Sequence, residues 1–364
     1  MNEFKSIIEL FAIEGEVQEI HPLGNGLIND TYKVVTAGDA PDYVLQRINN
    51  AIFTDVEMLQ SNIQAVTAHI RRKLTAAGED DIDRKVLRFI PLKADGRGTC
   101  CCVDGKWWRV SVFIRDAYTY ETVDPKYSEF AGEAFGNFEA MLADIPDELG
   151  ETIPDFHNME LRLRQLKEAV SADAAGRLAA DSGELHAILS EIDEHAQGMC
   201  LAEQLHREGK LPKRICHCDT KVNNMMFDAE GKVLCVIDLD TVMPSYVFSD
   251  FGDFLRTAAN PVPEDSPDLD KVDFDMSIFK AFARGYIKGT KPFLTPIERK
   301  NLPYAACLFP FMQAVRFFTD YINGDTYYKT QYPEHNLVRT RNQLTLFRSA
   351  LSKVPEMKEF ISSL

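Results

Sequence analysis

One short stretch carries most of the information about architecture: it reads Ile215-Cys216-His217-Cys218-Asp219-Thr220-Lys221-Val222-Asn223-Asn224, then Met225–Phe227, Asp228–Lys232 and Val233-Leu234-Cys235-Val236-Ile237-Asp238-Leu239-Asp240. The middle segment has turn composition and lies between two apolar runs, which predicts a β-hairpin folded near residue 230. In such a hairpin Asn224, just before the first strand, lies opposite the region of Asp238, just after the second. Asp219 precedes both by one loop.

The chemistry expected of this stretch is phosphoryl transfer. That reaction needs a carboxylate to orient and deprotonate the attacking hydroxyl, and oxygen ligands for a Mg²⁺ ion that bridges the nucleotide phosphates. The spacing H-x-D-x-x-x-x-N, from His217 to Asn224, is also that of the kinase catalytic loop. We therefore predict Asp219 as catalytic base, Asn224 and Asp238 as metal ligands, and His217 as a support of the loop. The alternative is that Asp219 and Asn224 only cap a turn and Asp238 only ends a strand.

Two further acidic positions need separate interpretation. Asp240 is predicted either as a second metal ligand or as a residue that holds the first in place, and the sequence leaves both open. Asp250-Phe251-Gly252 has the letters of the protein-kinase metal motif. The metal carboxylate should end the strand that pairs back from the catalytic loop, however, and Asp238 does so. We expect Asp250 to accept hydrogen bonds that hold the loop.

Outside this stretch the sequence pattern changes once along the chain, from mainly strands to mainly helices. A short helix pattern near the start is followed by strand patterns up to Ile48, and Thr54 with Glu57 resembles a capping box that opens a helix to about Lys73. Further segments are predicted as strands at 86–90, 100–103 and 107–114, with the turn Asp104-Gly105, and as helices at 127–144, 159–172 and 183–208, with more helix after residue 240. This order predicts an α+β, two-lobed protein-kinase-like fold: a β-rich N-terminal nucleotide-binding lobe, 1–114, and a mainly helical catalytic and substrate-binding lobe, 115–364.

Composition limits the partners. The chain has 364 residues, 45% of them hydrophobic, and a formal net charge of −16, which argues against nucleic acid or an anionic membrane as main partner. No apolar run approaches the ~20 residues that span a bilayer, and the N-terminus has no secretory-signal pattern. The eight cysteines lack the spacing of a zinc site and are expected to be reduced. We expect a soluble cytoplasmic protein.

The nucleotide side is predicted from the N-terminal strands. Gly24-Asn25-Gly26-Leu27-Ile28-Asn29 is a glycine turn between two strands, where backbone amides can approach phosphates. A cation is expected on the third strand, and Arg47 is the candidate, with Glu57 as its partner. Alternation leaves open whether the Gln46 or the Arg47 face is directed at the phosphates. The candidate nucleotide-binding residues are Gly24, Asn25, Gly26, Asn29, Thr31, Arg47 and Glu57.

The acceptor site is expected in the helical part. In the apolar segment 308–328, Gln313, Arg316 and Asp320 recur at i, i+3 and i+7 and form one polar stripe, either lining a pocket or facing solvent. Aromatic and hydrogen-bonding residues follow, including Tyr327. This mixture suits a neutral polyhydroxylated ligand better than a cationic one.

The chain resembles the aminoglycoside/choline kinase superfamily in its H-x-D-x-x-x-x-N segment and the following Ile237-Asp238. Over nearly its whole length it looks most similar to bacterial N-acetylhexosamine 1-kinases, in the phrases 23–32, 43–49, 217–224, 237–244 and 332–341. That resemblance implies ATP- and Mg²⁺-dependent phosphorylation of the anomeric hydroxyl of N-acetylglucosamine or N-acetylgalactosamine. It also implies sugar contacts from Arg316 and Tyr327. Cys218 and Arg115 depart from the related pattern.

Two other hypotheses stay open. The first is a kinase for another small alcohol, such as homoserine, methylthioribose, ethanolamine or an aminoglycoside-like compound. The second is a catalytically silent protein of this fold that binds a nucleotide or sugar. The presence of Asp219, Asn224 and Asp238 together disfavours the silent protein.

Overall fold

The computed structural model describes residues 2–24, 28–120 and 124–364. The chain divides into two compact units. The sheet unit comprises Met1–Thr119, Asp144–Pro154 and Asn224–Met243, and the helical unit comprises Tyr120–Ala143, Asp155–Asn223 and Pro244–Leu364. Among the described residues, no helix combines the length and the apolar character needed to cross a bilayer.

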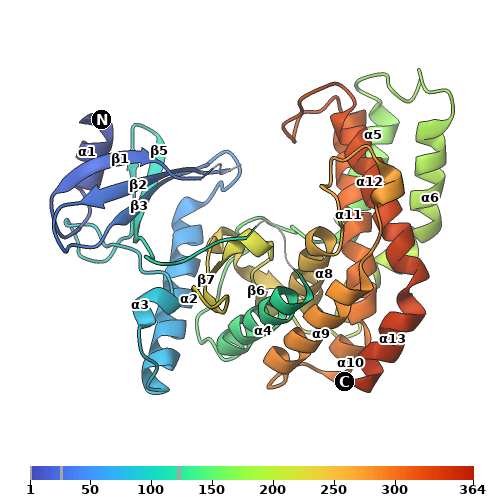
Figure 1. The fold of residues 1–364 in the computed structure, drawn as a ribbon. Helices are drawn as coiled ribbons and strands as arrows, with labels where there is room; N and C mark the ends of the chain where they lie inside the picture. The colour runs from blue at the N-terminus through green and yellow to red at the C-terminus, as the bar shows by residue number, and fades with distance from the viewer. Residues whose placement is uncertain (1, 25–27, 121–123) are drawn as a thin grey trace. The chain divides into compact units, whose positions relative to one another are not determined.

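The sheet unit is built on a five-stranded antiparallel sheet with the order β1-β2-β3-β5-β4 (Figure 1). Its strands are β1 Val17–Pro22, β2 Asp30–Thr36, β3 Tyr43–Ile48, β4 Cys100–Val103 and β5 Lys106–Val112, and its helices are α1 Asn2–Ile8, α2 Val56–Ala76 and α3 Ile82–Lys85. Alternate residues of β3 and β5, among them Leu45, Trp108 and Val110, pack with Ile7 and Ile8 of α1 into one buried core. The opposite face of these strands is therefore free to carry polar groups.

The predicted hairpins of this unit are confirmed. Asp104 and Gly105 both have positive φ, 51° and 74°, as a tight two-residue turn between β4 and β5 requires. The second hairpin pairs β7 Met225–Phe227 with β8 Val233–Val236. The segment 86–90, predicted as a strand, instead makes only an isolated bridge from Phe89 to Ser111.

The start of α2 differs from the predicted one. The N-cap is Asp55, whose side chain accepts the amide of Met58 at 2.9 Å, and Thr54 precedes the cap. A carboxylate is the better acceptor at this position because it also meets the positive end of the helix dipole. The same helix is tied to the segment after the second hairpin, since the Asn62 side chain donates to the carbonyl of Val242 at 3.2 Å.

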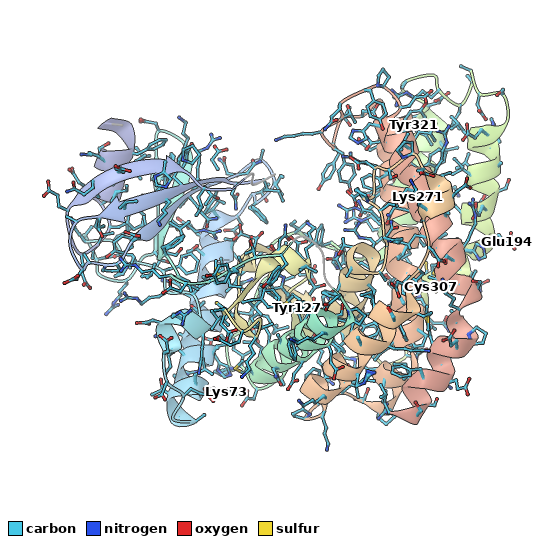
Figure 2. All side chains as sticks on the ribbon, viewed as in Figure 1. Lys73, Tyr127, Glu194, Lys271, Cys307 and Tyr321 are labelled. Atoms are coloured by element: carbon cyan, nitrogen blue, oxygen red, sulfur yellow. The ribbon has the colours of Figure 1, made fainter. Side chains whose placement is uncertain are left out.

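The helical unit contains ten α-helices among its described residues (Figure 1). They are α4 Pro125–Leu142, α5 Met159–Ala172, α6 Glu184–Met199, α7 Leu201–Arg207, α8 Val247–Ala258, α9 Met276–Thr290, α10 Pro296–Lys300, α11 Leu302–Ile322, α12 His335–Ser352 and α13 Val354–Ser363. The single helix predicted at 183–208 was wrong, because the backbone leaves helical geometry at Cys200 and divides it into α6 and α7. Helix α11 is buried along most of its length, and Cys307 is one of its interior side chains (Figure 2).

Helices α4 and α9 approach each other closely because both carry glycines four residues apart, Gly132 and Gly136 on α4 and Gly285 and Gly289 on α9. A Cβ atom on Gly285 would lie 2.0 Å from the carbonyl oxygen of Glu129, and one on Gly132 would lie 2.2 Å from that of Phe282. These contacts are with backbone atoms, which cannot turn aside as a flexible side chain can. The helix pair is therefore possible only with glycine at these positions.

Replacing Gly285 by alanine should destabilise the protein. We expect the variant to lower the free energy of unfolding by about 3 kcal/mol, because the added methyl group forces α4 and α9 apart. Gly198→Ala, in α6, is the matched control, since nothing lies within 4 Å of its added Cβ. Urea denaturation of both variants tests this, and equal stabilities would show that the close contact of α4 and α9 carries no cost.

Candidate active site

Carboxylate side chains of helix α8 hold the loop that contains Asp219. Asp250 accepts the backbone amide of His217 with Oδ2 at 2.8 Å and that of Cys218 with Oδ1 at 2.7 Å. Both oxygens of one carboxylate therefore bind consecutive amides. Cys218 has φ +63°, a left-handed conformation that a side chain disfavours, and these two hydrogen bonds fix the backbone on its N-terminal side.

A second carboxylate on the same helix holds the next part of the loop. Asp253 accepts the amide of Thr220 at 3.0 Å, and the Thr220 hydroxyl donates to the carbonyl of Asp250 at 2.8 Å. Asp250 and Asp253 are three residues apart and so occupy one side of α8. Between them, Gly252 leaves room for Phe309 of α11, whose ring would lie 2.3 Å from an added Cβ. The Asp250-Phe251-Gly252 segment thus has the geometry of a support for the loop.

Asp219 itself remains accessible. Its side chain is 22% exposed, and Lys221 Nζ lies 2.9 Å from its Oδ1. The negative charge of Asp219 is the main reason that the pKa of Lys221 rises to about 12, so this lysine is charged at neutral pH. The sequence analysis did not single out Lys221, although its position two residues after the predicted base could have indicated it.

His217 supports the loop from the interior. Its ring is fully buried and makes edge contacts with Phe135 and Phe138 at centroid distances of 5.6 and 5.9 Å. Its Nδ1 accepts the amide of Asp219 at 3.3 Å. These contacts match the expected supporting role, whose effect on activity stays a prediction.

In the sheet unit, the candidate metal ligands lie at one end of the second hairpin. The amide of Ile237 donates to the carbonyl of Asn224 at 2.9 Å, which extends the pairing of β7 and β8 by one step. Asp238 follows directly, with φ +58° where the chain turns into the 3₁₀ helix η2, Leu239–Thr241. The end of the hairpin thus carries an amide and a carboxylate side chain, the oxygen donors that Mg²⁺ prefers.

Asp240 is already bound on both oxygens within the sheet unit. Arg109 Nη1 lies 2.5 Å from Oδ1, and Asn29 donates to Oδ2 at 2.6 Å. The side chains of Arg109 and Asp240 are only 3% and 4% exposed, so this is a buried ion pair. Of the two roles left open by the sequence, this geometry favours holding the segment over binding metal.

Arg109 belongs to a row of polar side chains on the face of the sheet opposite the core. Its Nε donates to Gln46 at 3.0 Å, and Gln46 in turn donates to the Thr31 hydroxyl at 3.2 Å. Asn29 completes the row by accepting the amide of Asn49 at 2.9 Å. Thr31 and Asn29 are predicted nucleotide-binding residues, and they lie in this network. Gly24 has φ +69°, as a turn glycine can, while Asn25 and Gly26 lie outside the described residues.

The predicted ion pair between Arg47 and Glu57 was wrong. Arg47 Nε donates to Asp30 Oδ2 at 2.6 Å, because the two residues lie directly opposite in the register of β2 and β3. Both side chains are more than two fifths exposed. The Arg47 side chain lines a small surface pocket with Asn50 and Lys106, so a nucleotide contact from it stays a prediction.

The cation bound in the polar row is therefore Arg109 of β5, which the sequence analysis missed. The alternation of Trp108 and Val110 toward the core could have placed it on the other face.

The acceptor candidates lie in the helical unit, on α11 and after it. Arg316 donates to Gln313 at 3.1 Å, and Gln313 donates to the Tyr328 hydroxyl at the same distance. The Arg316 guanidinium also lies over the rings of Phe156 and Tyr328, at 5.3 and 5.7 Å. Gln313 and Arg316 thus form one connected group, as their spacing predicted.

Asp320 is part of the stripe but has a different role from its neighbours. It is buried, and it accepts the amides of Thr326 and Tyr327 at 2.9 and 2.8 Å and that of Tyr328 at 3.0 Å. It therefore holds the chain that leaves α11. Arg177 holds the same region through the carbonyl of Tyr321 at 2.5 Å (Figure 2). Tyr327, 62% exposed, is presented at the surface of this held segment.

Two residues near Arg316 were missed. Burial and the charges of Arg316 and Arg162 hold the pKa of His157 well below its ordinary value, while Asp219 acts in the opposite direction. His157 Nδ1 is buried and has no hydrogen-bond partner among the described residues. Burial and the nearby Arg316 likewise lower the pKa of Arg162 to about 10. A neutral histidine and two arginines are thus gathered in the unit that carries Asp219.

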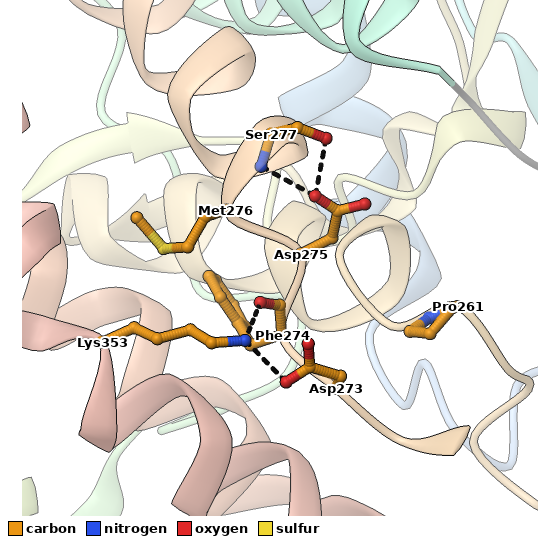
Figure 3. A pocket seen from close by; sticks show the side chains of 7 residues that line it. All are labelled: Pro261, Asp273, Phe274, Asp275, Met276, Ser277 and Lys353. Atoms are coloured by element: carbon orange, nitrogen blue, oxygen red, sulfur yellow. Dashed lines mark hydrogen bonds and ion pairs between the residues drawn. The ribbon is translucent and has the colours of Figure 1, made fainter.

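A separate surface pocket of the helical unit is satisfied by its own residues. Lys353 donates to Asp273 and to the carbonyl of Phe274, both at 2.6 Å, and Asp275 caps α9 by accepting the amide of Ser277 at 2.7 Å (Figure 3). Lys353 and Asp273 are paired with each other and Asp275 is bound to the start of α9, so we assign no site there.

Comparison with known proteins identifies the family. The model of the phosphotransferase enzyme family, APH, matches residues 19–289, well over half of the chain. The chain belongs to this phosphotransferase family. Among solved structures, an aminoglycoside phosphotransferase from Alicyclobacillus acidocaldarius is similar with a TM-score of 0.64 and 12% identity, over 99% of this chain and 96% of that one. The predicted protein-kinase-like fold, an antiparallel sheet followed by mostly helical chain, is confirmed.

Two further structures extend the comparison. A choline kinase from Cryptosporidium parvum has a TM-score of 0.59 and 14% identity, over 100% of this chain and 98% of that one. A spectinomycin phosphotransferase, solved with ADP and spectinomycin, has a TM-score of 0.54 and 12% identity, again over 100% and 98%. At these identities the likeness concerns the fold.

Substitution of the two arginine–aspartate pairs of the sheet unit, Arg109 with Asp240 and Arg47 with Asp30, should change stability by different amounts. Arg109→Met leaves the Asp240 carboxylate buried without its cation, and we expect the free energy of unfolding to fall by about 3–5 kcal/mol. Arg47→Met is the control, because an exposed pair contributes at most about 1 kcal/mol. Equal losses in chemical denaturation of the two variants would contradict the anchoring role of Arg109.

Proposed function

We propose that this phosphotransferase is an ATP- and Mg²⁺-dependent sugar 1-kinase that phosphorylates the anomeric hydroxyl of an N-acetylhexosamine, N-acetylglucosamine or N-acetylgalactosamine. Membership of the phosphotransferase family supports the reaction class. The bound ADP of the spectinomycin enzyme supports an adenine nucleotide as the donor. The sugar rests on the resemblance in the phrases named above and on the charge of the acceptor residues.

The observation that carries the acceptor class is the pair Arg162 and Arg316. Relatives of this fold include enzymes named for choline and for aminoglycosides, whose acceptors are cations. A cationic acceptor would be repelled by two guanidinium groups; the pKa of one of them, Arg162, is lowered by burial and further by the charge of the other. The neighbouring carboxylate Asp320 is engaged with backbone amides and is not available to offset them. A neutral polyol with carbonyl and hydroxyl acceptors suits these donors.

In the proposed mechanism Asp219 accepts a hydrogen bond from the acceptor hydroxyl and takes its proton as the oxygen attacks the terminal phosphate of ATP, whose bond to the leaving ADP breaks. Lys221, kept charged by Asp219, lies beside the base and offsets negative charge that develops on the transferred group. Asn224 and Asp238 would hold the Mg²⁺ ion, which neutralises phosphate charge when bound. Asp240 holds its segment through Arg109.

The remaining assignments complete the proposal. Gly24, Asn25, Gly26, Asn29 and Thr31 stay candidates for the nucleotide, with Arg47 and Glu57 as less supported members. Gln313, Arg316 and Tyr327 are proposed for the sugar, together with His157, and Asp320 is proposed to hold their segment. A cytoplasmic location is retained as part of the same proposal. The predicted single division at residue 114 differs from the structure, in which the sheet unit also includes 115–119, Asp144–Pro154 and Asn224–Met243.

Asp219→Asn is the test of the base. We expect kcat to fall by about 10²–10⁴-fold, because the amide cannot accept the proton, while nucleotide affinity stays nearly unchanged. Asp193→Asn, at an exposed position of α6, is the matched control. ADP release with ATP, Mg²⁺ and N-acetylhexosamine gives the rate, and normal turnover of the Asp219 variant would refute the assignment.

Asp238→Asn and Asp240→Asn separate metal binding from structural support. The first should raise the Mg²⁺ concentration needed for nucleotide binding at least about tenfold with little change in stability. The second should chiefly lower the free energy of unfolding, because it removes the partner of buried Arg109. Titration of nucleotide binding against Mg²⁺ distinguishes them; a metal requirement altered only in the Asp240 variant would exchange the two roles.

An acceptor screen tests the substrate class. N-acetylhexosamines, hexoses, choline, ethanolamine, homoserine, methylthioribose and an aminoglycoside are compared with ATP and Mg²⁺, and the position of the new phosphate is determined. We expect turnover of an N-acetylhexosamine to its 1-phosphate, and Arg316→Gln to raise KM for that sugar but not for ATP. Arg348→Gln, which affects only a surface pair with Glu191, is the control. Efficient turnover of choline alone would contradict the charge argument.

A further inference from the structure

Two buried acidic side chains lie directly behind the loop that carries Asp219. Glu139 of α4 is 2% exposed and Asp250 of α8 is fully buried. An oxygen of one carboxyl group lies within 4.8 Å of an oxygen of the other, and each carboxyl shifts the pKa of the other. Two carboxylates in such surroundings cannot both be charged without a large cost, so one of them must hold a proton.

The hydrogen bonds decide which carboxyl is charged. Each oxygen of Asp250 accepts a backbone amide of the loop, which stabilises its ionised form. Glu139 accepts one hydrogen bond, from the Tyr286 hydroxyl to Oε1 at 2.6 Å. Its Oε2 is buried without a donor among the described residues. A carboxylate oxygen in that position would lose its solvation without compensation, whereas a protonated one can donate.

We propose that Glu139 is a positioning residue: its neutral carboxyl donates the Oε2 proton to the Asp250 carboxylate, which thereby keeps both oxygens on the loop amides. The effect on catalysis rests on the proposed function, since it requires that this loop carries the catalytic base. The shared proton itself does not depend on that function.

The surrounding groups agree with a neutral Glu139. Burial is the main cause that raises its pKa well above the ordinary value, and the charges of Asp250 and of Glu298 of α10 act in the same direction. Glu298 is itself paired with Arg214, at 3.0 Å. Tyr286 of α9 is the opposing contact, because its hydroxyl donates to Glu139. Burial raises the pKa of Asp250 as well, whereas His217 and the hydrogen bonds that Asp250 accepts favour the ionised form of that carboxyl.

A metal ion is a poorer occupant of this cluster than a proton. Cys216 adds a thiol to the two carboxyl groups, and ligand atoms of the three residues lie within 4.8 Å of one another. A metal would require the thiolate, yet burial raises the pKa of Cys216 well above its usual range. It would also compete with the amides that already occupy both oxygens of Asp250.

The arrangement follows from the helix pair described above. Glu139 and Tyr286 lie on α4 and α9, whose glycines let the two backbones come close enough for this hydrogen bond. The Tyr286 hydroxyl oxygen also lies 3.3 Å from the carbonyl oxygen of Val247 at the start of α8, a second and more distant acceptor for the same proton. One close helix contact thus positions a proton donor against the helix that holds the loop.

Two substitutions of Glu139 distinguish a proton donor from a space-filling side chain. Glu139→Gln keeps an acceptor for Tyr286 and supplies an N–H for Asp250, so we expect kcat within about threefold of the wild type. Glu139→Leu fills the space but cannot donate, and it should lower kcat about tenfold or more while KM for ATP changes little. A glutamine variant as impaired as the leucine variant would overturn the proposal.

The dependence of stability on pH gives a readout that does not use the reaction. Because the folded state keeps Glu139 protonated, its contribution is fully present below the ordinary pKa near 4.5 and is lost as pH rises toward the raised pKa. The free energy of unfolding of the wild type should therefore fall with pH, relative to Glu139→Gln, from about pH 5 upward. Parallel curves for the two proteins would overturn the shared proton.

The two proposals can fail independently. If Asp219→Asn keeps its activity but the pH curves of wild type and Glu139→Gln diverge, the catalytic assignment fails and the shared proton stands. If the leucine variant does not fold, the pH comparison with the glutamine variant still decides, because that substitution preserves volume and hydrogen bonding.

Discussion

The carboxylate of Asp250 is the interaction on which the candidate active site depends in the helical unit. It accepts two consecutive backbone amides, which would otherwise be buried donors without acceptors, and so fixes the position of both. The left-handed conformation at Cys218 follows, since the chain must turn sharply after leaving those two amides. The turn exposes Asp219 while the preceding residues stay buried. An accessible carboxylate on a rigid backbone is what a catalytic base requires, because its position is then set before the substrate arrives.

The same carboxylate explains why the local sequence could mislead. Asp250-Phe251-Gly252 matches a metal motif letter by letter, yet each residue has a packing reason to be there. Asp250 binds amides, Phe251 is fully buried, and Gly252 admits the ring of Phe309. Strand pairing favours Asp238 over Asp250 for the metal, because it fixes which residues meet at the end of the hairpin, and the metal role of Asp238 stays a prediction. A three-residue motif is therefore weaker evidence for a metal ligand than the pairing register of two strands.

What could be predicted from the sequence was what depends on neighbours along the chain. The hairpin turns, most helix patterns and the α+β order depend on residues within a few positions, and they were correct. The cap at Asp55, the break at Cys200 and the segment 86–90, which is not a strand, differed from the prediction. The partner of Arg47 depended on the register of two strands. The role of Glu139 depended on the contact between two helices, because its partner Tyr286 is 147 residues away along the chain. Such long-range contacts have no periodic signal in one sequence.

Burial decides which of the charged residues interact strongly enough to affect stability or a pKa. Arg47 with Asp30 and Arg109 with Asp240 are both arginine–aspartate pairs of the sheet unit, but solvent screens the first and not the second. In the helical unit, burial is the main cause that lowers the pKa of Arg162, and the charge of Arg316 adds to it. Asp155 offsets part of the positive charge of Arg162, and a ligand with hydrogen-bond acceptors would offset more of it. Hydroxyl and carbonyl oxygens do so by accepting hydrogen bonds, whereas an ammonium group would add to the positive charge, and this difference is the physical basis for proposing a neutral acceptor.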